Sequence, residues 1–240
     1  MNKNTKVAII TGASRGIGAS VAEALAMDGY ITAITARSQD ALKELANKIS
    51  SKITTPNSPI IYSLDVQDHQ AVQDMVADVN SKFGHIDLLF NNAGIDMLGT
   101  THVSIEDFDK TMAINLRGAF SFLKAVVPIM KAQGNGTIIN VASRAGKIGF
   151  AELGVYGASK FGLVGLSESL YHELCPLGIK VTALCPSWVD TNMGQDSGLP
   201  REEMISTDDI VSSVRWLLSL SPAAVVKDLT IECRKDIAQR

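Results

Sequence analysis

The chain has 240 residues, of which 46% are hydrophobic and 20% charged, a composition that is ordinary for a globular protein and argues against a disordered one. This length is ample for one large core, so we expect a single domain over residues 1–240. The 22 basic and 25 acidic residues give a net charge of −3. Without a basic excess, the composition argues against nucleic acid and membrane surfaces as partners.

Neither a metal site nor a targeting segment is visible in the sequence. The three cysteines and four histidines are scattered without the spacing of metal ligands, so reduced cytosolic thiols are expected. No apolar run approaches the roughly 18–20 residues that cross a bilayer. The run at residues 7–10 is too short for the core of a signal peptide. We therefore expect a cytoplasmic protein with no metal.

Short apolar runs alternate with helical patterns along the chain. Ser38 is the expected N-cap of a helix that continues through Ile49, Gly29 is the expected stop of the helix before it, and residues 50–59 form a surface loop. Apolar residues at steps of three or four predict further helices within 72–83, 112–127 and 163–174. The expected strands are residues 7–11, 31–35, 60–64, 88–90, 137–141, 181–184 and 229–231.

This alternation predicts an α/β fold of Rossmann type, a doubly wound parallel sheet of about seven strands with helices on both faces. Such sheets bind ligands beyond the carboxyl ends of their strands, where the strand order changes direction. The residues that follow each strand are therefore the candidates for function.

A glycine-rich turn follows the first strand. Residues 11–18 read Thr-Gly-Ala-Ser-Arg-Gly-Ile-Gly and lead into a helical pattern. Gly12 would allow the tight turn, Gly16 would let the backbone approach a pyrophosphate, and Gly18 would let the helix pack close to the sheet. The N–H groups at the start of that helix favour phosphates. A plain turn is the alternative, but this placement favours dinucleotide binding.

The ends of the next strands refine this interpretation. The second strand leads to Ala36 and Arg37, where enzymes selective for NAD usually place an acidic residue. Arg37 and Arg15 suit the 2′-phosphate of NADP(H) instead, which we favour over the alternative that Arg37 is a solvated loop residue. Asp65, after the third strand, is the natural partner of an adenine amino group. Residues 91–94 (Asn-Asn-Ala-Gly), at the end of the fourth strand, are small and turn-prone, which is consistent with a backbone that passes close to a ligand.

A tyrosine and a lysine four residues apart form the candidate catalytic pair. Tyr156 and Lys160 lie on one face of a predicted helix, and a nearby ammonium lowers the pKa of a phenol. A tyrosine tuned in this way exchanges protons with an alcohol oxygen. Ser143, thirteen residues before Tyr156 at the end of a strand, could steady a substrate carbonyl. Asn115 lies in a helical run, where a buried amide needs partners.

In this order and spacing, residues 11–18, Asp65, 91–94, Asn115, Ser143 and 156–160 resemble the short-chain dehydrogenase/reductase family, in its short, NADP(H)-preferring branch. The resemblance covers residues 7 to about 191, and the chain is similar to 3-oxoacyl-acyl-carrier-protein reductases and small carbonyl reductases. The joint pattern is specific, although each motif alone is common.

The resemblance implies a role for each member of a tetrad. Tyr156 is the general acid/base, and Lys160 lowers its pKa and holds the nicotinamide ribose. Ser143 binds the substrate oxygen, and Asn115 holds a water that links Lys160 to solvent. It also implies that NADP(H) is preferred over NAD(H). The expected cofactor-binding residues are Gly12, Ser14, Arg15, Gly16, Ile17, Gly18, Arg37, Asp65, Val66, Asn92, Ala93, Gly94, Tyr156, Lys160, Pro186, Val189 and Thr191.

The chain departs from the family pattern at the turn after the sixth strand and at the C-terminal end. Ser187 replaces the glycine that usually follows the proline after the sixth strand, a change that we expect to be harmless. The last strand runs into a polar tail, residues 232–240, where many relatives are glycine-rich. Residues 1–6 are expected to be a flexible N-terminus, and 191–207 a mobile substrate lid. Phe150, Trp188 and Met193 are either pocket lining or core; Arg201 attracts an anionic substrate or is simply solvated.

The leading interpretation is an NADPH-dependent reductase of aldehydes or ketones, or the reverse alcohol oxidation. A 3-oxoacyl thioester reductase is the alternative within that class, and a non-catalytic dinucleotide-binding sensor or scaffold is the alternative outside it. A sugar-nucleotide epimerase fits poorly because its glycine spacing differs. By family analogy, the helices around 115–130 and 155–175 are expected to join subunits into a dimer or tetramer.

Overall fold

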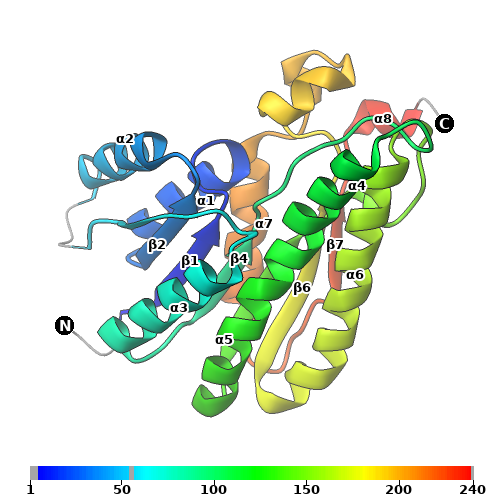
Figure 1. Ribbon diagram of the computed structural model, residues 1–240. Helices are drawn as coiled ribbons and strands as arrows, with labels where there is room; N and C mark the ends of the chain where they lie inside the picture. The colour runs from blue at the N-terminus through cyan, green and yellow to red at the C-terminus, as the bar shows by residue number, and fades with distance from the viewer. Residues whose placement is uncertain (1–4, 54–56, 239–240) are drawn as a thin grey trace.

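The structure, a computed structural model, describes residues 5–53 and 57–238 (Figure 1). Three parts of the expected loop and termini lie outside the described residues: 1–4 of the flexible N-terminus, 54–56 of the loop, and 239–240 of the polar tail. Within the rest of that tail, residues 234–238 form a short helix.

Seven parallel strands form one sheet in the order β3-β2-β1-β4-β5-β6-β7. All the predicted strands are present, and their ends differ from the prediction by at most two residues. Because the order changes direction between β1 and β4, the ligand-binding position is beyond their carboxyl ends. The strands are β1 (Val7–Thr11), β2 (Ile31–Ala36), β3 (Ile60–Ser63), β4 (Leu88–Asn91), β5 (Gly136–Val141), β6 (Ile179–Pro186) and β7 (Asp228–Ile231).

Polar side chains cap the start of several helices. Ser38, Asp68 and Ser206 each accept a hydrogen bond from a backbone N–H in the first helical turn. The predicted N-cap at Ser38 is confirmed, and the first helix ends just before Gly29 as predicted. The helices are α1 (Gly16–Met27), α2 (Gln39–Ser50), α3 (His69–Phe83), α4 (Ile105–Met112), α5 (Ala119–Gln133), α6 (Gly154–Leu174), α7 (Thr207–Ser219) and α8 (Arg234–Ala238).

Apolar cores on both faces of the sheet confirm the doubly wound arrangement. One core joins the sheet to α1, α2 and α7 through residues such as Leu25 and Leu42. The other joins it to α3, α5 and α6 through residues such as Phe122 and Leu174, and these three helices lie side by side in Figure 1. Because both faces are covered, the central strands are apolar without alternation; all five residues of β1 are buried.

One helical stretch is longer and more apolar than we predicted from the sequence. Residues 105–133 run through α4, the π-helical segment η1 (Ala113–Gly118) and α5 without a break, and among the described residues this stretch alone has the length and composition of a membrane span. In the fold it packs against the sheet, and 44% of its most apolar window is buried. Phe122, Val126 and Met130 on its buried face belong to the core on that side of the sheet.

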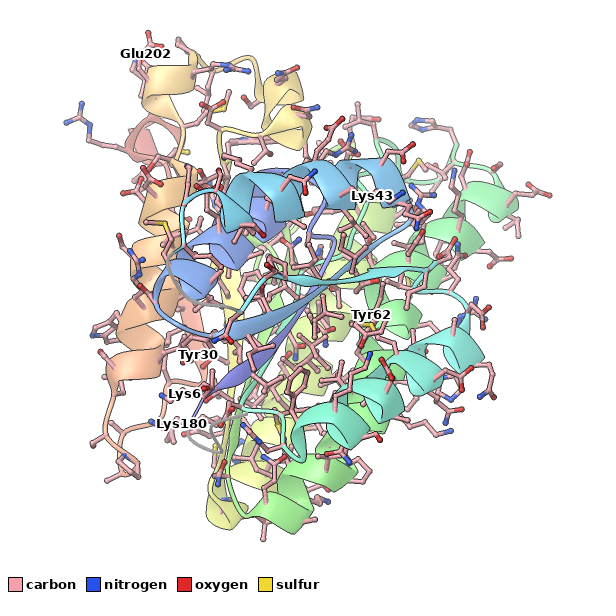
Figure 2. The ribbon with its side chains drawn as sticks, turned by 90° about the vertical axis from the view of Figure 1, so that its left-hand side faces the viewer. Lys6, Tyr30, Lys43, Tyr62, Lys180 and Glu202 are labelled. Atoms are coloured by element: carbon pink, nitrogen blue, oxygen red, sulfur yellow. The ribbon has the colours of Figure 1, made fainter. Side chains whose placement is uncertain are left out.

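The two ends of the strands differ in what they carry. Figure 2 shows Lys6, Tyr30 and Lys180 toward the end where β1, β2 and β6 begin, with the Lys6 ammonium 5.7 Å from the centre of the Tyr30 ring. Glu202, in the short helix η5 (Arg201–Glu203), lies at the opposite end. The expected lid therefore stands beyond the carboxyl ends of the strands, where ligands bind in such sheets.

Candidate active site

The glycine-rich turn has the backbone shape that the sequence predicts. Gly12 and Gly16 have φ angles of +63° and +56°, a left-handed conformation that glycine adopts without strain. A Cβ atom on Gly18 would lie 2.4 Å from the carbonyl oxygen of Gly12, so only glycine lets α1 begin this close to the strand. Ser14 and Ile17 are half-buried in the same turn. The turn presents open backbone at the start of α1, a cradle that suits a pyrophosphate.

Hydrogen bonds hold this turn against the end of β4. The Thr11 hydroxyl accepts from the backbone N–H groups of Asn92 and Ala93, both at 2.9 Å. The Asn92 amide donates to the carbonyl oxygens of Thr11 and Gly12 at 3.0 and 3.2 Å. A Cβ atom on Gly12 would lie 2.8 Å from Cα of Ala93. The predicted cofactor residues of β1 and β4 thus lie side by side at the switch point.

The segment after β6 approaches the same turn from the other side. Pro186 ends β6, and Val189 is buried and bridged in parallel to Ile205. A Cβ atom on Gly16 would lie 3.1 Å from Cγ2 of Thr191. The segments after β1, β4 and β6, which are far apart in the sequence, therefore lie close together around the glycine-rich turn.

The side chains predicted to select the cofactor differ in how they are held. Arg15 and Arg37 are exposed, and neither forms an ion pair with any residue that the structure describes. The Asp65 carboxylate accepts hydrogen bonds from the backbone and side-chain N–H groups of Gln67, at 3.0 to 3.3 Å. Val66 is buried. Both guanidinium groups are therefore open to solvent, whereas the Asp65 carboxylate is already bonded within the chain.

The two predicted hydroxyl groups converge. Ser143 follows β5, and Tyr156 lies in the first turn of α6; a side-chain hydrogen bond joins them. The Ser143 hydroxyl also accepts from the backbone N–H of Ala145 at 3.1 Å. This second bond orients the serine, because it starts the short helix η2 (Arg144–Gly146).

The pKa of Tyr156 is shifted in the direction opposite to the prediction. Burial raises this pKa to about 12, the hydrogen bond with Ser143 lowers it in part, and the charge of Asp96 raises it. The Lys160 ammonium stands over the tyrosine ring, 5.7 Å from its centre. The expected lowering by Lys160 does not occur in this structure: the lysine is not among the groups that shift this pKa, and desolvation of the phenol is the largest effect.

Lys160 is buried, with 4% of its surface exposed. Burial lowers its pKa to about 8, and its Nζ donates to the carbonyl oxygen of Val141 at 2.9 Å. A Cβ atom on Gly94 would lie 3.5 Å from this Nζ and 3.3 Å from Oδ1 of Asn115. The lysine therefore reaches from α6 to the end of β5 and to the loop after β4.

Asn115 lies in the π-helical segment η1, an irregularity that is frequent at functional sites. Its Oδ1 accepts from the N–H of Ile95 at 2.8 Å, and its Nδ2 donates to the carbonyl of Ile95 and to the Ser159 hydroxyl, at 2.8 and 3.0 Å. Both amide hydrogens are therefore used. The side chain fastens the loop after β4 to α6, a positioning role that the sequence did not predict.

The predicted substrate-side residues are held to different degrees. Trp188 packs against the core, and Met193 is 38% exposed in the short helix η4 (Asn192–Ser197). Phe150 is half-buried, and the Arg144 guanidinium lies 5.0 Å from the centre of its ring. Arg201 is exposed, and its Nε lies 3.5 Å from Oδ1 of Asp190.

Ser187, which we expected to be a harmless replacement for glycine, makes specific contacts that the sequence did not predict. Its Oγ accepts from the backbone N–H of Cys233 at 2.7 Å, and its own N–H donates to the carbonyl of Ile231 at 2.8 Å. The Cys233 thiol donates to the carbonyl of Trp188 at 3.0 Å. The residues after β7 are thus bound to the turn after β6. No local pattern in the sequence indicates this pairing.

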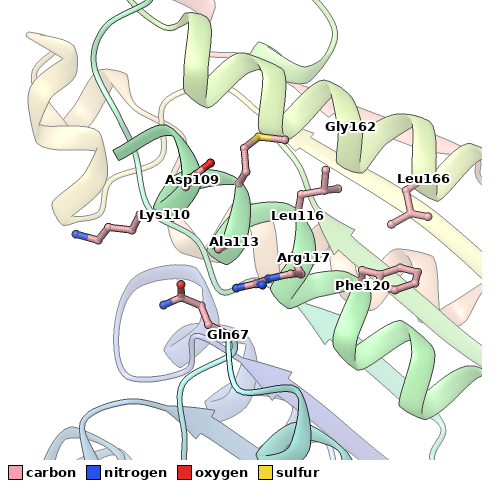
Figure 3. A pocket seen from close by; sticks show the side chains of 10 residues that line it. Gln67, Asp109, Lys110, Ala113, Leu116, Arg117, Phe120, Gly162 and Leu166 are labelled. Carbon is pink, nitrogen blue, oxygen red and sulfur yellow. The ribbon is translucent and has the colours of Figure 1, made fainter. Parts of the chain in front are cut away.

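A hollow lies on the outer side of α4, η1, α5 and α6, with a volume of about 920 Å³. Leu116, Phe120 and Leu166 line it in Figure 3, with Gln67 and Arg117 at one side. Among the described residues, no group of three or more His, Cys, Asp or Glu side chains is placed to hold a metal ion.

Comparison with known proteins identifies the family. The family model described as short chain dehydrogenase matches residues 6–202. A trans-4-hydroxycyclohexanecarboxylate dehydrogenase of Sinomonas cyclohexanicum is 38% identical over 200 residues, which cover 82% of this chain and 76% of that protein.

Two solved structures extend this similarity over almost the whole chain. A beta-ketoacyl-ACP reductase from Bacteroides thetaiotaomicron is 43% identical, with a TM-score of 0.88 over 98% of this chain and 100% of that one. An alcohol dehydrogenase from Thermococcus sibiricus, complexed with 5-hydroxy-NADP, is 32% identical, with a TM-score of 0.87 over 96% and 97%. The chain is an oxidoreductase that belongs to the short-chain dehydrogenase family.

Proposed function

We propose that this protein is an NADPH-dependent reductase of aldehydes or ketones, which also oxidises the corresponding secondary alcohols. One observation carries the proposal: the hydrogen-bonded hydroxyls of Ser143 and Tyr156 lie at the carboxyl end of the sheet, with Lys160 over the tyrosine ring. The glycine-rich turn that suits a dinucleotide lies at the same end of the sheet. This arrangement supports the assignment of Tyr156 as proton donor and Ser143 as hydrogen-bond donor to a carbonyl oxygen.

The proposed chemistry divides between cofactor and protein. When bound, NADPH supplies the hydride. Tyr156 transfers its phenolic proton to the substrate oxygen as negative charge develops there, and Ser143 donates a hydrogen bond to the same oxygen. In alcohol oxidation the tyrosinate accepts that proton instead. Lys160 binds the nicotinamide ribose and supplies positive charge beside the phenol.

The ionisation of Tyr156 favours the reducing direction. With a pKa raised to about 12, the phenol carries its proton at neutral pH. A protonated phenol is the form that serves as the acid in carbonyl reduction, whereas alcohol oxidation needs the phenolate. Reduction therefore proceeds well at neutral pH, and oxidation speeds up as the pH rises.

We assign the phosphate at the 2′ position to Arg15 and Arg37. Both are exposed and unpaired within the described part of the chain, and a guanidinium forms two parallel hydrogen bonds to a phosphate. The similarity to an alcohol dehydrogenase complexed with 5-hydroxy-NADP supports this assignment. Asp65 takes the adenine amino group, and the other predicted members of the cofactor set line the turn and its neighbours.

The resemblance implies a water bound at Asn115. That water must donate hydrogen bonds to oxygen atoms of Asn115, because the amide hydrogens of this residue are not available to it. Both of those hydrogens are bonded to Ile95 and Ser159. We therefore propose that the carbonyl oxygens of Asn115 accept hydrogen bonds from a water that links Lys160 to solvent. The role of Asn115 then combines fastening the site and passing protons to solvent.

Two classes of substrate are supported by the similarities to known proteins. Similarity to a beta-ketoacyl-ACP reductase supports a 3-oxoacyl thioester as the alternative substrate, and similarity to a hydroxycyclohexanecarboxylate dehydrogenase supports a small cyclic ketone. We favour a small carbonyl compound, admitted by a compact lid over residues 191–207. Turnover of a ketone but not of the matched thioester decides between these substrates.

We further propose that the chain acts as one domain in the cytoplasm and as a homo-oligomer. The hollow over α4, η1, α5 and α6 leaves Phe120 48% exposed on a largely apolar face. A face of this kind fits a second copy of the chain. Sedimentation equilibrium tests this: a dimer or tetramer is expected, and a monomer at micromolar concentration contradicts it.

A substrate screen tests the proposed function. The purified protein is given aldehydes, ketones and 3-oxoacyl thioesters with NADPH or NADH, and absorbance at the nicotinamide band is followed. We expect carbonyl-dependent consumption of NADPH. Tight NADPH binding without turnover of any carbonyl would instead support the non-catalytic sensor or scaffold.

A further inference from the structure

A buried cation directly follows the serine of the hydroxyl pair. Arg144 is the first residue of η2 and has 3% of its surface exposed. Its guanidinium lies 5.0 Å from the centre of the Phe150 ring, which covers one side of it. Burying a charge is unfavourable unless a partner of opposite charge accompanies it. The position of the serine loop therefore depends on what pairs with Arg144.

The partner comes from the C-terminal end of the chain. Oε1 of Glu232, the residue after β7, lies 2.7 Å from Nε of Arg144, and the Glu232 side chain is 26% exposed. Cys233 is held in turn by Ser187 and Trp188, through the hydrogen bonds described above. Glu232 is thus placed by both its neighbours in the sequence, Ile231 in the sheet and Cys233 in the core.

A second ion pair acts on the same loop. Nζ of Lys147 lies 3.1 Å from Oδ2 of Asp228 at the start of β7, and both side chains are about one-third exposed. The opposite side of the loop is fixed by close packing, since a Cβ atom on Gly146 would lie 2.7 Å from the carbonyl of Lys160. The loop after β5 is therefore held between α6 and the edge strand β7, and its buried contact is the one nearest Ser143.

We propose that Glu232 is a positioning residue of the active site: through the buried ion pair with Arg144 it holds the loop that carries Ser143 in register with Tyr156. This inference rests on the proposed function. It also gives the polar segment after β7 a role in catalysis within its own subunit. Removing the carboxylate leaves the guanidinium without that partner, so the loop shifts and the serine hydroxyl is displaced.

Kinetics on Glu232→Gln and Glu232→Asp test this role. We expect Glu232→Gln to lower kcat for carbonyl reduction about tenfold, part of the roughly 10²–10³-fold that loss of an oxyanion-hole donor brings. NADPH affinity stays within twofold. Glu232→Asp keeps the charge and recovers most of kcat. The matched control is Glu173→Gln, which removes an exposed ion pair with Lys131 and leaves kcat unchanged.

A pH profile separates positioning from a general loss of stability. Besides burial, the groups that act on the ionisation of Tyr156 are Ser143, which follows β5, and Asp96, which follows β4, while Lys160 on α6 stands over the tyrosine ring. Because the Ser143 hydrogen bond lowers the pKa of Tyr156, displacing the serine moves the rise of alcohol oxidation to higher pH. An unchanged profile together with an unchanged kcat in Glu232→Gln overturns the proposal.

Hydrogen–deuterium exchange gives a readout that needs no substrate. Backbone amides of residues 143–150 are expected to exchange faster in Glu232→Gln than in wild type or in Glu173→Gln. Equal exchange in all three proteins overturns the positioning role, whether or not a substrate is known. If wild type reduces no carbonyl, the proposed function fails by that result, while the exchange still decides how the loop is held.

Discussion

The half of the sheet from β1 to β4 and the half from β5 to β7 build their parts of the site in different ways. In the first half, glycines and backbone hydrogen bonds shape a cradle, and the cations beside it, Arg15 and Arg37, remain exposed. In the second half, Lys160 and Arg144 are buried, with 4% and 3% of their surfaces exposed. The first half forms a backbone cradle suited to binding, whereas the second half contains buried cations.

This difference has consequences for stability and for specificity. A cradle made by backbone and glycine adds little electrostatic strain, so changes beside it alter binding more than folding. Buried cations are unfavourable in a folded protein, and their positions are maintained by particular partners. We therefore expect substitutions in the second half to separate activity from stability.

The largest effect is expected at the serine of the second half. Ser143→Ala removes the hydroxyl that would bind the substrate oxygen, so kcat should fall about 10²–10³-fold while NADPH affinity changes little. Steady-state kinetics and a fluorescence titration with NADPH measure the two quantities. Ser169→Ala, at an exposed position of α6, is the matched control. Equal losses in kcat and in NADPH affinity would remove the division between the halves.

In the first half, the expected effect is on the choice of cofactor. Arg37→Asp replaces a cation that suits the 2′-phosphate with a carboxylate that suits a ribose hydroxyl. The ratio of kcat/KM for NADPH to that for NADH should fall about ten- to a hundredfold, in line with the loss of one charge-assisted hydrogen bond. Lys43→Asp, an exposed charge reversal on α2, should leave the ratio unchanged. An unaltered ratio in Arg37→Asp places the selection elsewhere.

A smaller effect of unusual sign is expected from Lys160→Met. Burial lowers the pKa of Lys160 to about 8, against 10.5 for an ordinary lysine, so the protonated side chain destabilises the folded protein below pH 8. After allowance for the lost hydrogen bond to Val141, the variant should be about 2 kcal/mol more stable at pH 7, and inactive.

The pH dependence provides the check on that variant. Because the folded pKa lies below the unfolded one, the penalty in wild type disappears as the pH rises from 8 toward 10.5. Urea unfolding at pH 7 and pH 9.5 should therefore show the stability gain shrinking. Lys43→Met, at an exposed site, should show no gain at either pH. A variant less stable than wild type at pH 7 contradicts the buried-charge argument.

The sequence predicted the first half of the site more completely than the second. Gly12, Gly16 and Asn92 act through local backbone shape and lie directly after strands, so their spacing indicates their position. Ser143 and Tyr156 were also predicted to act together, and the structure joins them by a hydrogen bond.

Contacts between distant segments were not predictable in the same way. The pairing of Arg144 with Glu232 and of Ser187 with Cys233 depends on how β6 and β7 align, which no local pattern encodes. The raised pKa of Tyr156 was missed because the extent of burial is a property of the fold. The apolar length of residues 105–133 was underestimated because the run is interrupted by single charges.

Tyr156→Phe tests the central claim most directly, because it removes one oxygen and leaves the ring in place. NADPH binding and carbonyl-dependent NADPH oxidation are measured side by side in wild type, Tyr156→Phe and Tyr171→Phe, a change on the same helix outside the site. We predict that Tyr156→Phe binds NADPH like wild type and turns over at least about a hundredfold more slowly, whereas Tyr171→Phe remains active. Full turnover by Tyr156→Phe would contradict the assignment of this phenol as the proton donor.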